Sequence, residues 1–151
     1  MQSTNARRLG RTLGAVLTGT ALAAALQVGL APGALAAAGC SGGTDPDALL
    51  WPSGYNMNAM TAKADHLTVI LRYNTWNDCA WGKITGARKG DRVWVDWSNT
   101  GGGSWEGPLS LTIKNGNGSG SAYTSAYSDA GYLMRACAQP SGSGVTCTGW
   151  Y

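Results

Sequence analysis

The sequence of 151 residues contains no phenylalanine, a single histidine (His66) and no closely spaced cysteine pair. A cysteine-based zinc site needs such close spacing or additional histidines, so zinc is the weaker explanation of the four cysteines. A Ser-His-Asp or Cys-His nucleophile would depend on His66, and neither a nucleophile elbow nor a Cys-His signature accompanies it. Walker loops, a GxGxxG turn after a strand and the acidic spacing of a calcium loop are also missing. We therefore expect no metal, no cofactor and no catalytic residue.

A basic excess is missing too, once the N-terminus is set aside. The chain has eleven Lys and Arg against eight Asp and Glu, a net charge of +3, and this excess consists of Arg7, Arg8 and Arg11. The part that follows is neutral. Nucleic-acid binding needs a basic surface that displaces phosphate counterions, so we expect no nucleic-acid partner.

The three arginines precede an uninterrupted Ala/Leu/Val/Gly/Thr run that ends in "PGALAAAGC", which is the layout of an export signal. Ala34-Leu35-Ala36 suits a signal peptidase, so residues 1–36 are the expected signal peptide and Ala37 begins the mature chain. Cleavage after Ala38 is the second choice. A transmembrane anchor is a weaker alternative, because the run is only marginally long enough to span a bilayer.

The route of export has two further alternatives. The Arg7-Arg8 pair is weakly typical of twin-arginine export, and "AAGC" before Cys40 partly fits a lipoprotein site. We expect a secreted, extracellular protein with no membrane contact after signal cleavage.

All four cysteines lie in the 115 residues after the expected cleavage site. An even number of cysteines in a small exported chain predicts disulfides, which supplement a limited core. Three pairings are open. Cys137 and Cys147 flank the loop "AQPSGSGVT", which favours a hairpin staple and leaves Cys40 to pair with Cys79.

The mature chain shows the two-residue period of β-strands and almost no helical period. In "LTVILRYN" the residues Leu67, Val69, Leu71 and Tyr73 share one face. Further strands are expected in "CAWGKIT", "RVWVDWSN", "PLSLTIK", "AYTSAYS", "GYLMRACA" and "GVTCTGWY", with these residues pointing inward: Val93, Val95, Trp97, Leu109, Leu111 and Ile113. The pattern predicts an all-β domain over residues 61–151, a small sandwich or barrel of six or seven antiparallel strands stapled by disulfides.

Residues 37–60 contain prolines and glycines and no clean period. We expect them to form an extended N-terminal arm held by Cys40.

Seven tryptophans and six tyrosines are the most prominent feature of the composition. Trp97 and Trp81 have the parity of core residues. Exposed tryptophans supply large contact area at little entropic cost, so the less easily buried ones are candidate partner-binding residues. They are Trp51, Trp76, Trp94 and Trp105.

Carboxylate chemistry is the remaining enzymatic alternative. Asp96 and Glu106 would have to approach each other in space to form a glycosidase pair. The parity of Asp96 on its strand and the glycine-rich loop beside Glu106 make this the weaker reading.

Several separate motifs resemble one family. The chain contains "CSGGTDP", then "LRYN-x-x-x-x-CAWGKITGARKGDRVWV", then "RACA" and "CTGWY". These are similar to the C-x-G-x-D-P, L-R-Y-S, C-x-A-W-A-R-I and G-D-x-V motifs of the YjfA-like family of small exported actinobacterial proteins of unknown function. The resemblance covers most of residues 39–151. Two departures are the lack of a further cysteine after "TDP" and Lys83 in place of arginine, and the first of them favours the Cys40–Cys79 pairing.

The resemblance implies a function without catalysis. Some similar proteins act as adaptors in umbrella toxin particles, where they link a lectin-like protein to the repeats of a large toxin chain, and an extended N-terminal segment docks in a partner's cleft. The corresponding partner-binding residues here are Ala37, Ala38, Gly39, Ser41, Gly42, Gly43, Thr44, Asp45 and Pro46. We expect a protein-binding adaptor. A carbohydrate or cell-wall binding module that stacks sugars on Trp76, Trp94 and Trp105 is the first alternative, and a small secreted hydrolase is the second.

Overall fold

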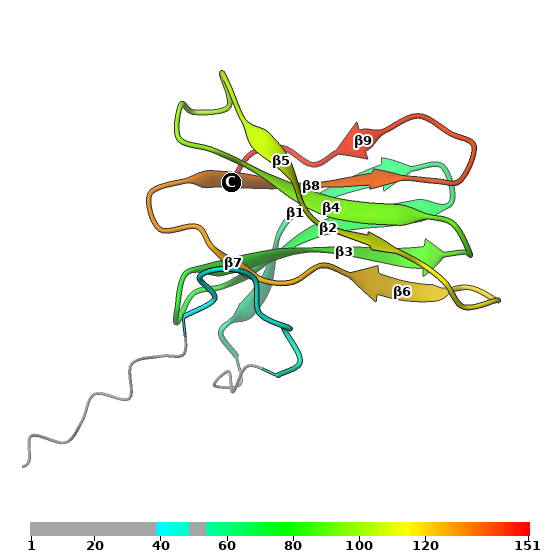
Figure 1. Cartoon of the computed structure of the whole chain (residues 1–151), viewed down its shortest axis with the longest axis horizontal. Coiled ribbons are helices and arrows are strands. Elements are labelled where there is room, and N and C mark those ends of the chain that lie inside the picture. Colours follow the sequence, from blue (N-terminus) through cyan, green and yellow to red (C-terminus); the bar gives the residue numbers. More distant parts are fainter. Residues whose placement is uncertain (1–38, 49–53) are drawn as a thin grey trace, which may run out of the picture. The chain divides into compact units, whose positions relative to one another are not determined.

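The structure, a computed structural model, describes residues 39–48 and 54–151. Nine strands form two antiparallel sheets, and no helix occurs in these residues (Figure 1). The first sheet has the order β1-β2-β3-β6, with β7 also paired to β3, and the second has the order β5-β4-β8-β9. The expected all-β fold with two disulfides is confirmed.

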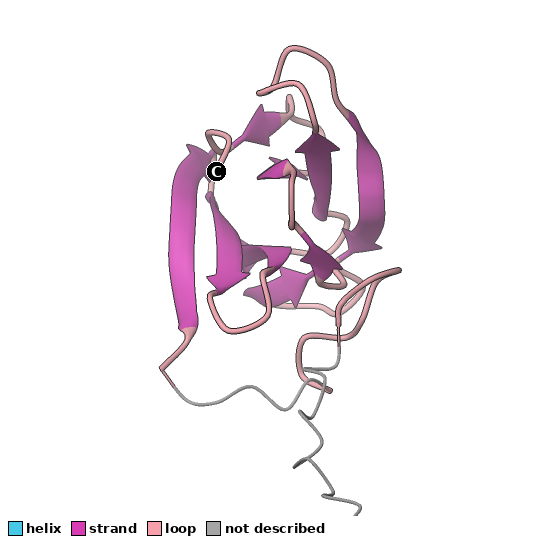
Figure 2. Cartoon of the chain, turned by 90° about the vertical axis from the view of Figure 1, so that its left-hand side faces the viewer, coloured by secondary structure: helices cyan, strands magenta, loops and turns pink. Residues whose placement is uncertain are grey.

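The strands of the first sheet are β1 (Asn56–Ala64), β2 (Leu67–Asn74), β3 (Cys79–Ala87), β6 (Gly120–Tyr123) and β7 (Tyr127–Ser128). Those of the second sheet are β4 (Arg92–Ser98), β5 (Glu106–Ile113), β8 (Leu133–Gln139) and β9 (Thr146–Cys147). Seen from the left-hand side of Figure 1, the strands of the two sheets surround a common interior (Figure 2).

The core lies between the sheets and follows the alternation in the sequence. Leu67, Val69 and Leu71 of β2 are fully buried, as are Val93 and Val95 of β4, and they belong to one hydrophobic cluster. Burial of such branched aliphatic side chains is the main stabilising contribution in a domain of this size.

The two sheets approach closely where β3 crosses β4, because residue 82 is glycine. A Cβ atom at Gly82 would lie 3.1 Å from the carbonyl oxygen of Trp94 and 3.3 Å from a methyl carbon of Val95. A larger residue would therefore push the sheets apart.

The expectation that Leu111 and Ile113 point inward with Leu109 is wrong. Leu109 packs against the core, but Leu111 and Ile113 are 47% and 43% exposed. Ser110 has a φ of 49°, and the pairing of β5 with β4 shifts register between Leu109 and Thr112. This bulge inserts one residue and reverses the alternation beyond it, which places both side chains on the outer face.

Strand β1 begins at Asn56, so the last part of the segment described as an arm belongs to the first sheet. Its register against β2 shifts between Asn58 and Met60. This bulge hides the two-residue period that identifies a strand in the sequence.

Two expected strands are shorter than their sequence patterns. "AYTSAYS" is divided between β6 and β7, because the hydroxyl of Thr124 takes the place of a backbone acceptor for the N–H of Gly82. "GVTCTGWY" contains only the two-residue β9, although Tyr151 continues along β8 through two backbone hydrogen bonds with Met134.

Candidate functional site

A hollow of about 350 Å³ lies on the outer face of the second sheet. Its floor consists of three cross-strand pairs between β4 and β8: Arg92 with Gln139, Trp94 with Cys137, and Asp96 with Arg135. These residues line one face because side chains two positions apart in a strand point the same way. In this sheet that face is open rather than packed against the first sheet.

The walls of the hollow are largely apolar. Leu111 and Pro108 come from β5, and Val145 stands in the loop before β9. Val145 is 53% exposed and Leu111 47%. The β5 bulge therefore contributes directly to the site, because it turns Leu111 outward toward the hollow.

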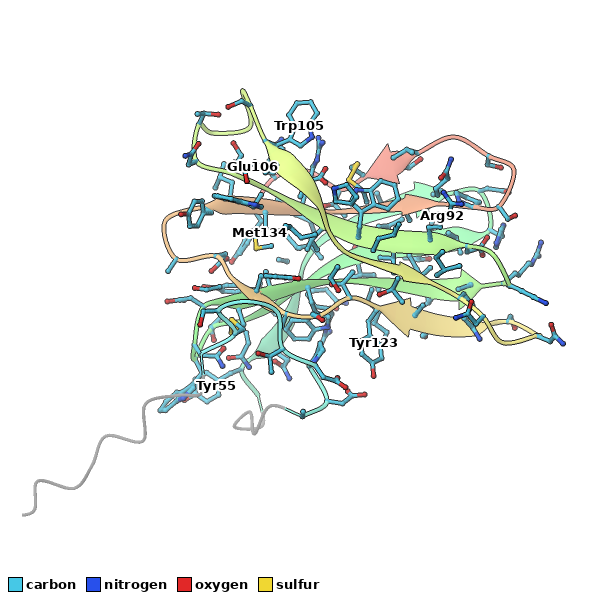
Figure 3. All side chains as sticks on the ribbon, in the orientation of Figure 1. Tyr55, Arg92, Trp105, Glu106, Tyr123 and Met134 are labelled. Atoms are coloured by element: carbon cyan, nitrogen blue, oxygen red, sulfur yellow. A yellow bond between two sulfur atoms is a disulfide. The ribbon has the colours of Figure 1, made fainter. Side chains whose placement is uncertain are left out.

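The guanidinium of Arg135 contacts the rings of two tryptophans. Its guanidinium carbon lies 4.5 Å from the ring centroid of Trp105 and 4.5 Å from that of Trp150. Each contact is a cation–π interaction, which gains strength when water is partly excluded. Trp105 lies beside the start of β5 next to Glu106 (Figure 3), so the arrangement ties the loop before β5 to the C-terminus.

The charge of Arg135 is balanced by Asp96. Nε–H donates to Oδ2 of Asp96 at 2.9 Å, Nη2 forms an ion pair with the same oxygen at 2.9 Å, and the two side chains are 18% and 5% exposed. The interaction fixes the guanidinium and satisfies the carboxylate. Arg135 is consequently a rigid part of the floor.

Arg92 stands at the opposite end of the hollow and has a different environment. It is exposed, and none of the ion pairs among the described residues includes it. Figure 3 shows Arg92 and Trp105 well separated along the sheet. The hollow thus has one uncompensated positive charge, at the Arg92 end.

The structure brings together only two of the expected tryptophans. Trp94 and Trp105 line the hollow. Trp76, 56% exposed, lies elsewhere, in the β2–β3 turn, with its ring 5.3 Å from that of Tyr55. Trp51 lies outside the described residues. A flat platform of Trp76, Trp94 and Trp105 is therefore not formed.

Trp97 takes the core position expected of it, whereas Trp81 is buried in a separate cluster on the other face of β3 from Ala80 and Ile84 of the main core. Trp81 is 6% exposed and clusters with Cys40, Cys79 and Ala126. Trp97 packs against the main core, with its ring 4.2 Å from that of Tyr132.

The segment 39–48 is fastened to the first sheet at several points. Cys40 forms a disulfide with Cys79 of β3, and Thr44 exchanges two backbone hydrogen bonds with Ala126. The hydroxyl of Tyr123 donates to Asp47, which raises the pKa of Tyr123 to about 12. Figure 1 shows this segment beside β7. Of the expected partner-binding positions, Gly39, Ser41, Gly42 and Asp45 are exposed, while Ala37 and Ala38 lie outside the described residues.

Next to this segment, the edges of the two sheets leave a second hollow of about 310 Å³. Its lining combines Ser41 and Gly42 with Trp97, Leu109, Tyr132 and Met134. It opens beside the exposed N-terminal residues and is mostly apolar.

The four cysteines form two disulfides, Cys40–Cys79 and Cys137–Cys147, as expected. The one group of three metal-type ligands found in the described part of the chain is Asp96 with Cys137 and Cys147. Because these two sulfurs are bonded to each other, they supply no thiolate to a zinc ion.

Both ring nitrogens of His66 lie within hydrogen-bonding distance of an acidic side chain. Nε2 lies 2.8 Å from the buried carboxylate of Asp91, and Nδ1 lies 3.3 Å from Asp65. The hydrogen bond with Asp91 raises the pKa of His66, and burial opposes this only in part. An imidazole occupied in this way has no nitrogen left to activate a nucleophile.

Asp91 has an anchoring role in the β3–β4 turn. Its burial disfavours the charged form, but N–H groups of Arg88 and Ser141 together with His66 donate to the carboxylate and lower its pKa. Asp91 therefore joins the turn to the β8–β9 loop as a charged group.

A second acidic cluster lies at the opposite end of β3. Burial and the nearby charge of Asp78 raise the pKa of Asp129 to about 6. Tyr73 donates a hydrogen bond to Asp78 at 2.6 Å, and burial and this bond raise the pKa of Tyr73.

Comparison with protein-family models, with curated proteins and with solved structures found no match. No helix in residues 39–48 and 54–151 has the length and apolar character required to cross a membrane. What defines the protein is therefore a disulfide-stapled, two-sheet β-domain with an aromatic hollow on one outer face.

Proposed function

We propose that the mature protein is a secreted adaptor that binds other proteins and performs no catalysis. The observation that carries this proposal is the hollow itself. Asp96 and Arg135 in its floor neutralise each other, and two tryptophan rings cover the Arg135 guanidinium, which suits a recognition surface better than a proton-transfer site. Tryptophan and arginine side chains within a largely apolar surface are typical of protein interfaces.

An adaptor needs two surfaces, and the domain offers two on different sheets. The hollow belongs to β4, β5 and β8, whereas segment 39–48 is fastened to β3 and to the chain near β7. Two disulfides suit an oxidising, extracellular location, because such bonds persist outside the cytosol.

The resemblance to the YjfA-like family extends the proposal to specific partners. We assign the lectin-like subunit of a toxin particle to the exposed N-terminal residues and the large repeat protein to the body of the domain. Neither assignment depends on the other, so each can be tested alone.

Affinity purification from culture supernatant tests the adaptor. The tagged protein is expected to retain a lectin-like chain and a very large repeat protein, both identified by mass spectrometry. Replacing exposed residues in the segment, Ser41→Arg with Asp45→Arg, should release one partner and keep the other. Trp105→Ala is expected to show the converse pattern. Recovery of the protein as a lone monomer from native supernatant would contradict the proposal.

Trp76→Ala is the matched control for Trp105→Ala, because the two side chains are 56% and 55% exposed but only Trp105 lines the hollow. Circular dichroism and thermal unfolding of each variant must first show an intact fold. Equal loss of both partners in the two tryptophan variants would mean that neither surface has the role assigned here.

A glycan is the second candidate ligand, since Trp94 and Trp105 share one hollow and sugars stack on such rings. Retention on insoluble peptidoglycan or chitin that is lost in Trp94→Ala and Trp105→Ala, but kept in Trp76→Ala, would favour it.

A further inference from the structure

The distribution of polar partners in the hollow restricts what it can bind. We propose that the hollow takes an extended peptide segment in which an acidic residue lies two positions from an aliphatic or aromatic one. This inference rests on the proposed protein-binding function and names the chemistry of the segment recognised.

The first step is charge. Asp96 is already paired with Arg135 through a hydrogen bond from Nε–H and an ion pair with Nη2, and Nε2 of Gln139 donates to the carbonyl of Ser143 at 3.2 Å. Arg92 is the charged lining residue without an ion pair in the described chain. A carboxylate on the ligand would form an ion pair with Arg92. The net positive charge of the hollow also favours the approach of an acid.

The second step is spacing. Arg92, Trp94 and Asp96 succeed each other on one face of β4, so neighbours in this row are about 6–7 Å apart. Side chains at positions i and i+2 of an extended peptide have the same separation. A carboxylate over Arg92 therefore places the next side chain on that face above Trp94, between Leu111 and Val145.

The third step separates a peptide from a sugar. A glycan needs several uncommitted hydrogen-bonding groups and a free ring face for stacking. Here one face of Trp105 is covered by Arg135, and the polar groups of the floor other than Arg92 are already paired. The aliphatic walls offer contact to side chains instead, which favours the peptide.

The experiment uses the mature protein and two blocked peptides, Ac-Leu-Thr-Glu-Thr-Leu-NH2 and its Gln counterpart. The peptide is symmetric about the acid, so it can bind in either strand direction. Binding is followed by the shifts of the Trp94 and Trp105 indole N–H signals in ¹⁵N NMR spectra at low millimolar peptide. The Glu peptide is expected to bind about twofold to fivefold more tightly than the Gln peptide at low salt, as one exposed charge pair allows.

Arg92→Gln should abolish the difference between the two peptides, and Arg88→Gln should not. Arg88 is also an exposed arginine but does not line the hollow. An N-acetylglucosamine hexamer, which carries no carboxylate, should leave both indole signals in place.

Three outcomes would overturn the inference. Equal binding of both peptides would remove the acidic requirement while leaving protein binding by the hollow intact. Indole shifts with the sugar alone would contradict the proposed function as well as this inference. Absence of shifts with every probe would show that short extended segments of this chemistry do not bind here, and the supernatant purification would then decide the adaptor role separately.

Discussion

Arg135 places both Nε and Nη2 2.9 Å from a single oxygen of Asp96, the first as a hydrogen-bond donor and the second in an ion pair, on the outer face of a sheet where most ion pairs would be solvated. The pair is shielded because Trp105 and Trp150 cover the guanidinium. Its energetics are accordingly those of a buried pair, in which the desolvation of each charge is offset by the other.

Removing one member of this pair should destabilise the domain strongly. Arg135→Met leaves the carboxylate of Asp96, which is 5% exposed, without its partner, and a cost of about 3–5 kcal/mol is expected from urea unfolding. The double variant Arg135→Met with Asp96→Asn should cost less than the single one, since the unpaired charge is gone. Arg92→Gln is the control, expected to change the free energy of unfolding by less than about 0.5 kcal/mol. A cost of Arg135→Met close to that of the control would show that the pair is effectively solvated.

The two disulfides should differ in their contribution. Cys40–Cys79 closes a loop with a sequence separation of 39, and Cys137–Cys147 one of 10. The chain-entropy model then gives about 4 kcal/mol for the first bond and about 3 kcal/mol for the second. Unfolding of the two Cys→Ala double variants measures the difference. Hydrogen exchange at the Thr44 and Ala126 amides should accelerate only in the variant that lacks Cys40–Cys79, and protection unchanged there would mean that the β-bridge holds the segment by itself.

The outward orientation of Leu111 beyond the β5 bulge can be tested by comparison with a buried leucine. Leu71→Ala removes a fully buried side chain and should cost about 2–5 kcal/mol. Leu111→Ala is the same chemical change at a side chain that is 47% exposed, and it should cost less than about 1 kcal/mol. Thermal and urea unfolding of both variants suffice. Equal costs would mean that Leu111 points into the core, as simple alternation in the sequence suggests.

The sequence was sufficient for the parts of the fold that depend on regular alternation. In β2 and β4 the buried aliphatic residues Leu67, Val69, Leu71, Val93 and Val95 are those of the expected face, because side chains two positions apart meet the same core. The cysteine pairing also followed from spacing, since a short loop favours Cys137–Cys147 and leaves one partner for Cys40.

The candidate site was predictable only in part. Trp94 and Trp105 could be identified as aromatic residues outside the core, but Arg135 and Trp150 carried no local signal. Their association depends on how β8 and the C-terminus are placed beside the loop before β5. Long-range sheet order of this kind is set by tertiary packing, which a single sequence does not reveal.

Stability should depend on pH through two groups that bind protons more tightly in the folded state. The pKa of His66 is raised by its hydrogen bond with Asp91, and burial together with Asp78 raises the pKa of Asp129 to about 6. The stabilising contribution of His66 is complete below its unfolded pKa of about 6.5, and that of Asp129 below its unfolded pKa of about 3.8. Each contribution is lost as the pH rises through the pKa of the folded state. Asp91 has the opposite sign, because its pKa is lowered and its contribution is lost as the pH falls below about 3.8.

The free energy of unfolding is therefore expected to rise as the pH falls from about 8 to about 5 and to decline again in stronger acid. Asp129 accounts for on the order of 1–2 kcal/mol of the rise after allowance for solvent screening. Urea unfolding across this pH range measures the profile. Asp129→Asn should weaken the pH dependence near pH 6 and raise stability at neutral pH, because it removes a partly buried charge and its repulsion from Asp78. His66→Gln should remove the remaining slope above the ordinary histidine pKa. A profile in Asp129→Asn that keeps the full slope of the wild type would assign the dependence to other groups.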